Sequence, residues 1–533
     1  MLSGGRERVM TGSGRVNRAV SGLCAIAGRC VLMSCLLLPC GGMVAQGNVS
    51  AATNQPAAPY IQQAAKAGKE SIPVLFLSDI HFEPFWDPGK APQLAAAPAR
   101  EWKKILAAPP SADREQRFAA LRQSCHTRGE DTSYVLFESS LQAAHTHATG
   151  ARFVAVSGDL IAHAFPCKFD ALFPHAAPGD YRAFVEKTIA FVLEELGSAL
   201  PSVPVYAALG NNDSDCGDYQ LDAHSDFLAE SGKEFTRNFP APEKQGALET
   251  FAAGGYYSVH LPAPVGNARL LVLNDLFMSS KYTTCAGKND SSGADAQIVW
   301  LQQQLTDARL NKEKIWVMGH IPPGVDLHGT VTKMRDVCGG QKPEMFLSSE
   351  KMADEIADFS DVVALGIFAH THMDETRILK AEDQDDGLKT GKSASAKSVA
   401  VKMVASISPI DGNAPSFTVA RVDPSSAALV DYRVFTATNQ TGMDTEWKEE
   451  YDYAQTYGEA DFSAASVEKM IAGFQGDASA QTEASRAYIR NFLAGKASPL
   501  LGLVWPQYVC SQENHSAQGY TLCVCGGAPS VAK

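Results

Sequence analysis

The sequence has little positive charge for its size. Its 46 Lys and Arg residues stand against 59 Asp and Glu residues, which gives a formal net charge of −13 over 533 residues. A surface this acidic repels polyanions at long range, so the charge excludes nucleic acid as an expected partner. The same repulsion counts mildly against any polyanionic substrate, unless bound cations reverse the potential locally.

A stable membrane span is also missing from the expected mature chain. Arg15 and Arg18 precede an apolar run, which Arg29 interrupts and which small residues follow up to Ala45. This is the build of a secretory signal peptide. A permanent anchor is the alternative, but the apolar stretch after the interruption is short for a bilayer. We therefore expect a leader over residues 1–45 and a secreted or periplasmic protein.

Charged residues are few, at 20% of the chain, whereas 45% of the residues are hydrophobic. This composition excludes a disordered protein and allows one large catalytic domain with appendages. The Ala- and Gln-rich residues 46–71 are expected to be a linker. The catalytic domain is placed at 72–440, and a helical, cysteine-containing C-terminal subdomain at 441–533. We find no internal repeat.

Cysteines are present in an even number after the leader. Four of the twelve lie within residues 1–45 and eight follow. In an exported chain this favours disulfides, with buried free thiols as the alternative. Spacing does not settle the pairing, although Cys510, Cys523 and Cys525 are close enough in sequence to staple a local structure.

Short, continuously apolar runs recur along the chain and are typical of strands that are covered on both faces. They are residues 73–78, 153–157, 204–209, 270–274, 315–318 and 363–368. Helical patterns lie between them at 132–147, 180–196 and 294–309, whereas the runs at 402–407, 417–422 and 429–435 have no helix between them. Residues 88–112 and 381–397 are expected to be loops. The pattern predicts an α/β protein, α+β in part, with a mixed β-sheet sandwich flanked by helices.

Ionisable residues gather where the predicted strands end, which is where an α/β sheet presents its ligand crevice. Asp79 and His81 follow the first strand, and positions i and i+2 of an extended segment point the same way. Asp159 follows the second strand, where it could also simply cap the next helix.

Three further strands end in the same manner. Asn211 follows the third strand, His320 follows the run at 315–318, and His370 and His372 follow the run at 363–368. Each motif alone is a weak signal, because a single histidine or an Asn-rich turn usually has a structural role. Their joint occurrence at strand ends indicates a metal site, since imidazole and carboxylate together suit Zn, Mn or Fe better than Mg or Ca.

The series D-x-H, G-D, G-N-x-D, G-H and H-x-H, over about residues 72–375, resembles the calcineurin-like metallophosphoesterase family. The resemblance implies that two divalent ions share one aspartate. It assigns Asp79, His81, Asp159 and His372 to the first ion, and Asp159, Asn211, His320 and His370 to the second. Two such ions can clamp a phosphoryl oxygen and activate a water, so no protein nucleophile is needed.

Two positions depart from the family pattern. Ala369 replaces a glycine, a small change, but Asn212 stands where the family ordinarily has a histidine that assists the leaving group. Asparagine can donate a hydrogen bond to substrate but cannot deliver a proton. His163 is the expected replacement acid, with a purely structural helix-start role as the alternative. Asn274, after another strand, is expected to line the crevice and contact substrate.

A histidine at that spacing is similar to the acid sphingomyelinase-like branch, as is the opening Asp-Ile-His-Phe-Glu-Pro at 79–84, while Gly-Asn-Asn-Asp at 210–213 is similar to endopolyphosphatases. The resemblance implies hydrolysis of a phosphodiester or phosphoanhydride in a small phosphorylated substrate: a nucleotide, a phospholipid headgroup or polyphosphate. The alternative is a catalytically inactive metal-binding or interaction module that retains the fold.

Overall fold

The computed structural model describes residues 71–381, 398–496 and 498–526. The expected leader, nearly all of the expected linker and most of the loop expected at 381–397 lie outside the described residues. Residues 71–526, apart from those gaps, belong to one compact unit.

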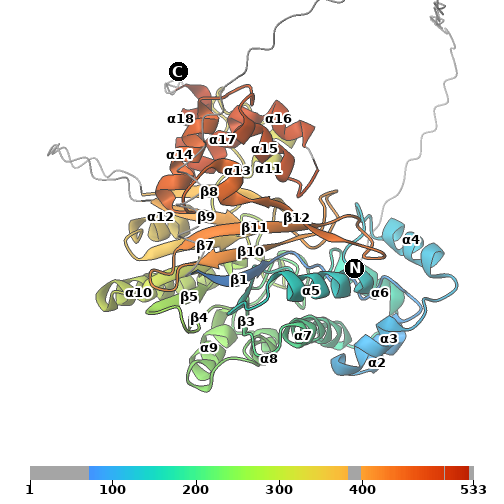
Figure 1. The fold of residues 1–533 in the computed structure, drawn as a ribbon. Coiled ribbons are helices and arrows are strands. Elements are labelled where there is room, and N and C mark those ends of the chain that lie inside the picture. Colours follow the sequence, from blue (N-terminus) through green and yellow to red (C-terminus); the bar gives the residue numbers. More distant parts are fainter. Residues whose placement is uncertain (1–70, 382–397, 497, 527–533) are drawn as a thin grey trace, which may run out of the picture. The chain divides into compact units, whose positions relative to one another are not determined.

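Two six-stranded sheets form the centre of this unit (Figure 1). The first contains β1 (Ile72–Leu77), β2 (Val154–Val156), β3 (Val205–Ala207), β10 (Ser416–Val422), β11 (Leu429–Ala437) and β12 (Trp447–Asp452), in the order β12-β11-β10-β1-β2-β3. The second contains β4 (Tyr257–His260), β5 (Ala268–Val272), β6 (Lys314–Met318), β7 (Val363–Phe368), β8 (Glu375–Lys380) and β9 (Ser398–Met403), in the order β4-β5-β6-β7-β9-β8.

Both sheets are mixed, as the sequence predicts. In the first, β1, β2 and β3 are parallel, and β10, β11 and β12 add an antiparallel half. In the second, β5, β6, β7 and β9 are parallel, with β4 and β8 antiparallel at the two edges. The carboxyl ends of the parallel strands therefore meet at one edge of each sheet, where the candidate ligands follow.

Aromatic side chains join the two sheets. The Trp316 ring of β6 packs edge-on against Phe76 of β1 and Phe153, with centroids 6.0 and 5.7 Å apart. The indole N–H donates to Ala427 O at 2.8 Å, so the one polar atom of this buried ring is satisfied. Burial on both faces explains why the strand sequences are continuously apolar.

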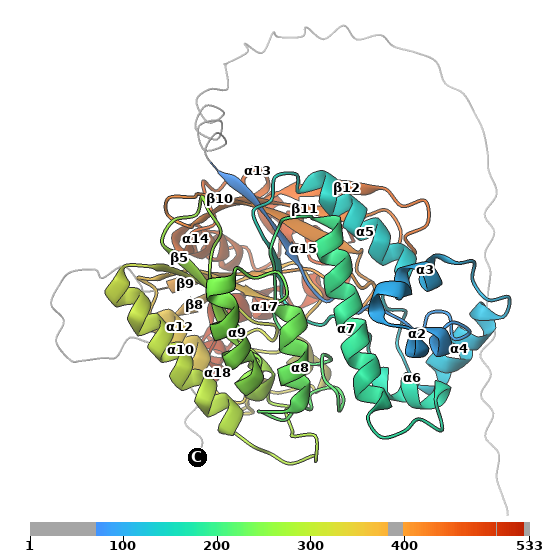
Figure 2. The same ribbon diagram turned by 90° about the horizontal axis from the view of Figure 1, so that it is seen from below.

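Helices cover the outer faces of the sheets. Contacts of α5 with β10, and of α7 and α8 with β3, place these three helices on the first sheet, whereas α10 contacts β6 and α12 contacts β8 and β9 on the second (Figure 2). The helices before residue 360 are α2 (Ala91–Ala96), η1 (Ala99–Glu101), α3 (Trp102–Ala107), α4 (Arg114–Ser124), α5 (Tyr134–His147), α6 (Phe165–Leu172), α7 (Asp180–Ala199), α8 (Asp226–Phe235), α9 (Ala241–Gly254), η2 (Asp275–Met278), α10 (Ser292–Asn311), α11 (Leu327–Thr332) and α12 (Lys351–Asp358). The loop expected at 88–112 is thus wrong, because α2 and α3 form there and bury Leu94 and Trp102.

The C-terminal part is helical, as expected. It consists of α13 (Tyr453–Tyr457), α14 (Ala464–Gln475), α15 (Glu483–Asn491), α16 (Pro499–Leu503), α17 (Trp505–Glu513) and α18 (Ala517–Cys525). Helices α14 and α17 pack against β8, and Figure 1 shows the group gathered on that side of the strands. The first sheet runs on through β12, past residue 440, where the sequence places the boundary. Among the described helices, none combines the length and the apolar character that crossing a membrane requires.

All eight cysteines that follow the expected leader are paired. The disulfides are Cys125–Cys167, Cys216–Cys285, Cys338–Cys525 and Cys510–Cys523. Only Cys510–Cys523 is a local staple of the kind expected from the sequence, because Cys525 reaches back across 187 residues to Cys338. Four disulfides fit a protein that folds in an oxidising compartment.

A buried acid on β12 makes stability depend on pH. Burial raises the pKa of Glu450 to about 8, and the negative charge of Asp374 acts in the same direction. The folded state therefore holds a proton that the unfolded state releases above its lower, ordinary pKa. Stability is lost as pH rises towards the folded pKa, so the Glu450→Gln variant should gain stability over the wild type between about pH 5 and pH 8.

Thermal unfolding at pH 5 and pH 8 measures this effect. At about 1.4 kcal/mol per pKa unit, we expect the Gln variant to unfold several degrees higher than the wild type at pH 8, and the two proteins to be nearly equal at pH 5. Glu449→Gln, a change at the exposed neighbour on the same strand, is the control. A stability difference between wild type and Glu450→Gln that does not change with pH would contradict a proton on Glu450.

Candidate metal centre

The seven candidate ligands all lie on loops that follow the parallel strands. Five of them have a backbone φ in the left-handed region, namely Asp79 (44°), His81 (43°), Asp159 (55°), His370 (73°) and His372 (65°). Non-glycine residues rarely adopt this conformation, and such backbone strain concentrates at functional sites. Here it turns side chains from separate loops towards one another.

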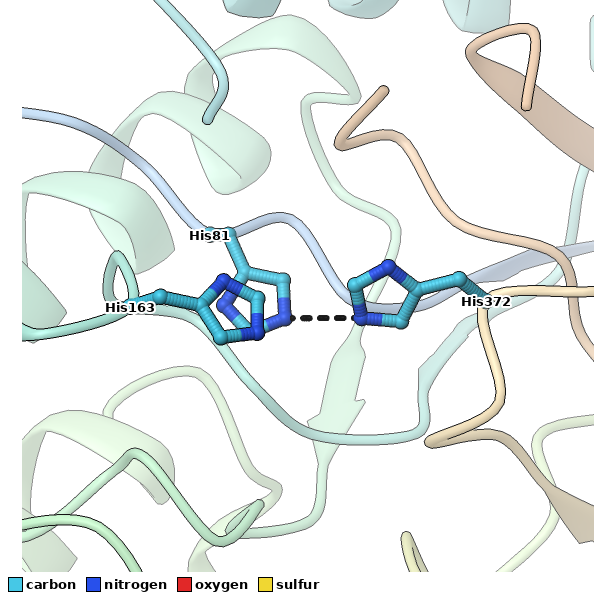
Figure 3. Close-up of side chains that lie close together, drawn as sticks. All are labelled: His81, His163 and His372. Atoms are coloured by element: carbon cyan, nitrogen blue, oxygen red, sulfur yellow. Dashed lines mark hydrogen bonds between the residues drawn. The ribbon is translucent and has the colours of Figure 1, made fainter. Parts of the chain in front are cut away.

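One group of these side chains surrounds the space between Asp79 and His372. His81 Nε2 lies 3.1 Å from His372 Nε2 (Figure 3). His372 Nε2 is 3.4 Å from Asp79 Oδ1, and His81 Nε2 is 3.4 Å from Asp159 Oδ2. These four side chains are the set that the resemblance assigns to the first ion.

A second group continues from the same aspartate. Asp159 Oδ2 lies 3.2 Å from His320 Nε2, which is 3.0 Å from Asn211 Oδ1 and 3.3 Å from His370 Nδ1. These four side chains are the set assigned to the second ion. Asp159 is the residue that both groups share.

Each imidazole is oriented by a contact of the ring nitrogen that points away from the cluster. His81 Nδ1 lies 2.9 Å from Ile161 O, and His320 Nδ1 lies 2.7 Å from Ser157 O. Because a carbonyl oxygen only accepts, both Nδ1 atoms carry a proton, and in the neutral form of each ring the inward Nε2 atom has a free electron pair.

The other two imidazoles have side-chain partners. His372 Nδ1 is 3.1 Å from Asp411 Oδ2, and His370 Nε2 is 3.1 Å from Tyr219 Oη. A carboxylate beside Nδ1 favours the proton on that nitrogen, so the His372 Nε2 that faces His81 also has a free electron pair.

In these neutral tautomers, electron-pair donors face one another across the cluster. The buried carboxylate of Asp79 adds to this imbalance, because neither of its oxygens accepts a hydrogen bond from the described chain. Such an arrangement is unfavourable unless a cation lies among the donors. The residues therefore fit divalent metal ions, with nitrogen and oxygen donors that suit Zn, Mn or Fe.

Two further acids hold the loops in place. Asp213 accepts from the backbone N–H groups of Gly210 and Ile161, and so joins the loops after β2 and β3. Asp275 accepts from the backbone N–H groups of His320 and Ile321. Burial raises the pKa of each of these carboxyl groups to about 7.

The electrostatics of the cluster centre on Asp159. Burial raises its pKa, but the adjacent His320 and His81 outweigh burial and leave the pKa well below its ordinary value. Burial lowers the pKa of His320, but the negative charge of Asp159 raises it to about 10, so without a cation His320 Nε2 holds a proton that a metal ion would displace. Burial and the positive charge of His163 lower the pKa of His81 to about 3, so its neutral form can act as a ligand.

His163 lies at the edge of the first group. Its ring stacks on His81 with centroids 3.9 Å apart (Figure 3). Asp131 accepts from the backbone N–H and from Nδ1 of His163, and Ser408 also donates to this carboxylate. Burial lowers the pKa of His163, but Asp131 raises it to about 9. The imidazole is one-third exposed.

His163 is also near enough to be considered as a ligand, because His81, His163 and His372 offer nitrogen atoms within 4.8 Å of one another. Its Nδ1 is already bound to Asp131, so Nε2 is the atom available to the site. The geometry of His163 is compatible with a role as proton donor and with a role as an additional metal ligand.

The two asparagines expected to contact substrate have different surroundings. Asn212 donates to Asp159 Oδ1 from its backbone and to Oδ2 from its side chain, at 2.8 and 2.9 Å, so it orients the shared carboxylate. Asn274 does not join the cluster. It is fully buried, and its side-chain amide donates to Gly254 O at 3.0 Å.

Several residues that orient the ligands could not be recognised in the sequence. Asp411 lies in a Pro-Ile-Asp-Gly segment after β9, which is an ordinary turn sequence. Tyr219 follows the third motif by several residues, and Asp131 lies just before α5. None of the three follows a parallel strand directly, so position alone did not mark them.

Removing Asp411 should weaken metal binding. Without this carboxylate, His372 loses the partner that fixes its tautomer and ring, and such outer partners are typically worth about 10- to 100-fold in metal affinity. We expect Asp411→Ala to show a loss of this size in chelator competition, and Asp411→Asn a smaller one. Unchanged affinity in both variants would show that Asp411 does not orient His372.

Comparison with known proteins agrees with this geometry. Residues 72–374 match the model of the calcineurin-like phosphoesterase family. The chain is 26% identical over 399 residues to acid sphingomyelinase-like phosphodiesterase 3b of Homo sapiens, covering 74% of this chain and 80% of the relative. It is 23% identical over 347 residues to sphingomyelinase phosphodiesterase C of Dictyostelium discoideum, covering 63% of this chain and 70% of the relative.

A third relative is the cyclic GMP-AMP phosphodiesterase SMPDL3A of Homo sapiens, at 27% identity over 278 residues. The match covers 51% of this chain and 55% of the relative. The family model spans more than half of the chain, and the relatives belong to one branch of the family. The chain is therefore a phosphoric ester hydrolase of the calcineurin-like phosphoesterase family, in its acid sphingomyelinase-like branch.

Proposed function

We propose that this protein is an exported phosphodiesterase or phosphoanhydride hydrolase that works with two divalent metal ions. The observation that carries the proposal is the shared carboxylate of Asp159, with His81 Nε2 and His320 Nε2 on its two sides at 3.4 and 3.2 Å and with the other ring nitrogen of each histidine bound to a backbone carbonyl. A structural role does not require a shared carboxylate between two sets of imidazoles.

The chain's own residues divide the work. The seven ligands hold the ions, which when bound polarise the phosphoryl group and lower the pKa of water. Ile161 O, Ser157 O and Asp411 keep the ligand nitrogens directed inward. Asn212 holds the shared carboxylate, and its amide is also a candidate for a hydrogen bond to a substrate oxygen.

His163 is the proposed proton donor to the leaving oxygen. His163 takes the role of the family histidine whose position Asn212 occupies here, because asparagine has no proton to give at neutral pH. Asp131 fixes the ring through Nδ1, so Nε2 carries the transferable proton and faces the site. Partial exposure of the imidazole allows the proton to be replenished from solvent.

The proposed substrates are small phosphorylated molecules. The relatives are named for sphingomyelinase and for cyclic GMP-AMP phosphodiesterase, which supports a phosphodiester in a phospholipid headgroup or a nucleotide. Polyphosphate is the third candidate, on the Gly-Asn-Asn-Asp sequence at 210–213. Export is proposed from the leader-like residues 1–45 together with the four disulfides.

Hydrolysis assays with the purified exported chain test the proposal. We expect turnover of bis(p-nitrophenyl) phosphate that a chelator abolishes and that Zn, Mn or Fe restores. Parallel assays with sphingomyelin, ATP and polyphosphate rank the substrates. Bound metal without turnover of any of them, at every pH from 4 to 9, would reject the enzyme in favour of an inactive binding module.

A further inference from the structure

A lysine stands beside the second group of ligands. Lys281 Nζ donates to Tyr219 Oη at 3.2 Å, and Tyr219 Oη lies 3.1 Å from His370 Nε2. The Lys281 ammonium is also 4.8 Å from the centroid of the Tyr219 ring. One residue, Tyr219, thus links this cation to a metal-ligand candidate.

The position of Lys281 is imposed by the fold. Its loop is paired with the segment after the third motif, since Thr283 N donates to Tyr219 O and Leu221 N donates to Thr283 O, at 3.1 and 3.3 Å. The Cys216–Cys285 disulfide closes the same pair of segments. Ser280 N donates to Phe346 O on the other side. The backbone of the Lys281 loop is therefore held beside the site, and the hydrogen bond to Tyr219 Oη directs the ammonium towards it.

Aromatic rings complete this side of the site. Tyr219 and Phe346, both partly exposed, present themselves edge-on to His370, with interplanar angles of 87° and 83°. The ammonium of Lys281 already interacts with the Tyr219 ring and hydroxyl. A second cation that approached this ring would meet the Lys281 charge at close range.

Lys281 forms no ion pair with any carboxylate of the described chain. The carboxylate of Asp218, which accepts from Asn211 Nδ2 at 2.7 Å, lies close enough for the charge of Lys281 to act on it, but the two side chains form no ion pair in the described structure. Lys281 is exposed. On a chain with a net charge of −13, a fixed and unpaired cation at the site is available for an anionic ligand.

We propose that Lys281 selects substrates in which the group next to the reacting phosphoryl is anionic, as in a phosphoanhydride, over those in which it is a choline. The inference rests on the proposed function and narrows its substrate class. An additional phosphate would gain a charge-assisted hydrogen bond from Lys281. A trimethylammonium group would be repelled by Lys281, whose ammonium already interacts with the Tyr219 ring. Lys281 thus favours phosphoanhydride substrates and disfavours choline esters.

Substrates that share a phosphoryl centre but differ in the neighbouring charge test this proposal. ATP and inorganic tripolyphosphate carry an anionic neighbour, bis(p-nitrophenyl) phosphate a neutral one, and p-nitrophenylphosphorylcholine a cationic one. For Lys281→Gln we expect kcat/KM to fall about tenfold with ATP, tripolyphosphate or both, the size of one charge-assisted contact. It should stay within about twofold for the neutral diester and be equal or higher for the choline ester. A loss with ATP alone assigns a nucleotide, and a loss with both assigns phosphoanhydrides in general.

The matched control is Lys288→Gln, an exposed lysine on the same loop whose backbone bonds to Thr284 and which has no recorded contact with the ligands. It should leave kcat/KM unchanged for every substrate. Equal losses for all substrates in Lys281→Gln would show a structural role, and an unchanged kcat/KM for both ATP and tripolyphosphate would show that Lys281 does not meet the anionic group. Either result overturns the proposal.

Ligand binding gives a readout that does not depend on turnover. In calorimetric titrations of the metal-loaded protein, wild type should bind α,β-methylene-ADP more tightly than phosphorylcholine, and Lys281→Gln should remove about tenfold of that preference. A wild-type protein that hydrolyses no substrate but keeps this binding preference would fail the proposed function while supporting the role of Lys281. A wild type that hydrolyses diesters but prefers phosphorylcholine would support the proposed function and reject the role of Lys281.

Discussion

Replacing Asp159 with asparagine should cost the protein both metal ions and at least about a thousandfold in turnover. Among the carboxylate oxygens of the described residues, Asp159 Oδ2 is the one that faces His81 Nε2 and His320 Nε2 together, at 3.4 and 3.2 Å. A neutral amide binds divalent ions more weakly and cannot bridge two of them with a negative charge. Elemental analysis of the purified variant, with bis(p-nitrophenyl) phosphate turnover, measures both losses.

A control is needed because Asp159 is buried and charged. Asp180→Asn, at an exposed acid at the start of α7, should retain full metal content and activity. Thermal unfolding of Asp159→Asn shows whether the variant is folded. A folded Asp159→Asn protein that keeps two ions and normal turnover would remove Asp159 from the centre of the site.

Replacing His163 with glutamine should lower turnover about 100- to 10,000-fold, the usual contribution of a general acid, while metal content stays unchanged. Glutamine can keep a hydrogen bond to Asp131 but cannot release a proton. The loss should be largest for substrates with an alkoxide leaving group and smaller for p-nitrophenyl esters, because nitrophenolate departs without protonation. Turnover of both substrate types, with metal analysis, provides the measurement.

The matched control is His145→Gln, which replaces an exposed histidine on α5 whose Nδ1 contacts Ala199 O. It should leave both rates unchanged. If His163→Gln loses metal in proportion to activity, His163 is a ligand, in line with its place beside His81 and His372. If the loss is the same for alkyl and p-nitrophenyl esters, His163 does not protonate the leaving oxygen.

The main strands could be predicted because burial on both faces makes their sequences continuously apolar. The edge strands β4, β8 and β12 were missed. Strand β4 has only four residues, and the sequences of β8 and β12, Glu-Thr-Arg-Ile-Leu-Lys and Trp-Lys-Glu-Glu-Tyr-Asp, are mostly polar and show no such run. The missed helices α2 and α3 are only six residues each in an Ala- and Pro-rich segment. Local sequence there carries too little periodicity to reveal them.

The seven candidate ligands could be recognised in the sequence for a topological reason. Parallel strands bring their carboxyl ends to one edge, so residues that directly follow them must lie close together. Residues such as Asp411, Tyr219 and Lys281 reach the site from loops whose course depends on tertiary contacts and on a disulfide. A position directly after a strand does not by itself place a side chain in the cluster: Asn274 follows β5, but its amide donates to Gly254 O.

The disulfide pairing could not be predicted either. Cys338 and Cys525 are 187 residues apart; Cys338 lies in the loop after α11, and the C-terminal helix α17 contacts α11. Cys216–Cys285 joins the third motif, which follows β3 of the first sheet, to the Lys281 loop, which follows β5 of the second, so this pairing depends on a contact between the two sheets. Spacing along the chain carries no information about either contact.

Crystallography of the wild-type protein with anomalous scattering at the Zn, Mn and Fe absorption edges tests the central claim most directly. We expect two peaks, one among Asp79, His81 and His372 and the other among Asn211, His320 and His370, with Asp159 between them. A protein grown with these metals that shows no peak at Asp159, or a single peak elsewhere, would contradict the two-ion centre.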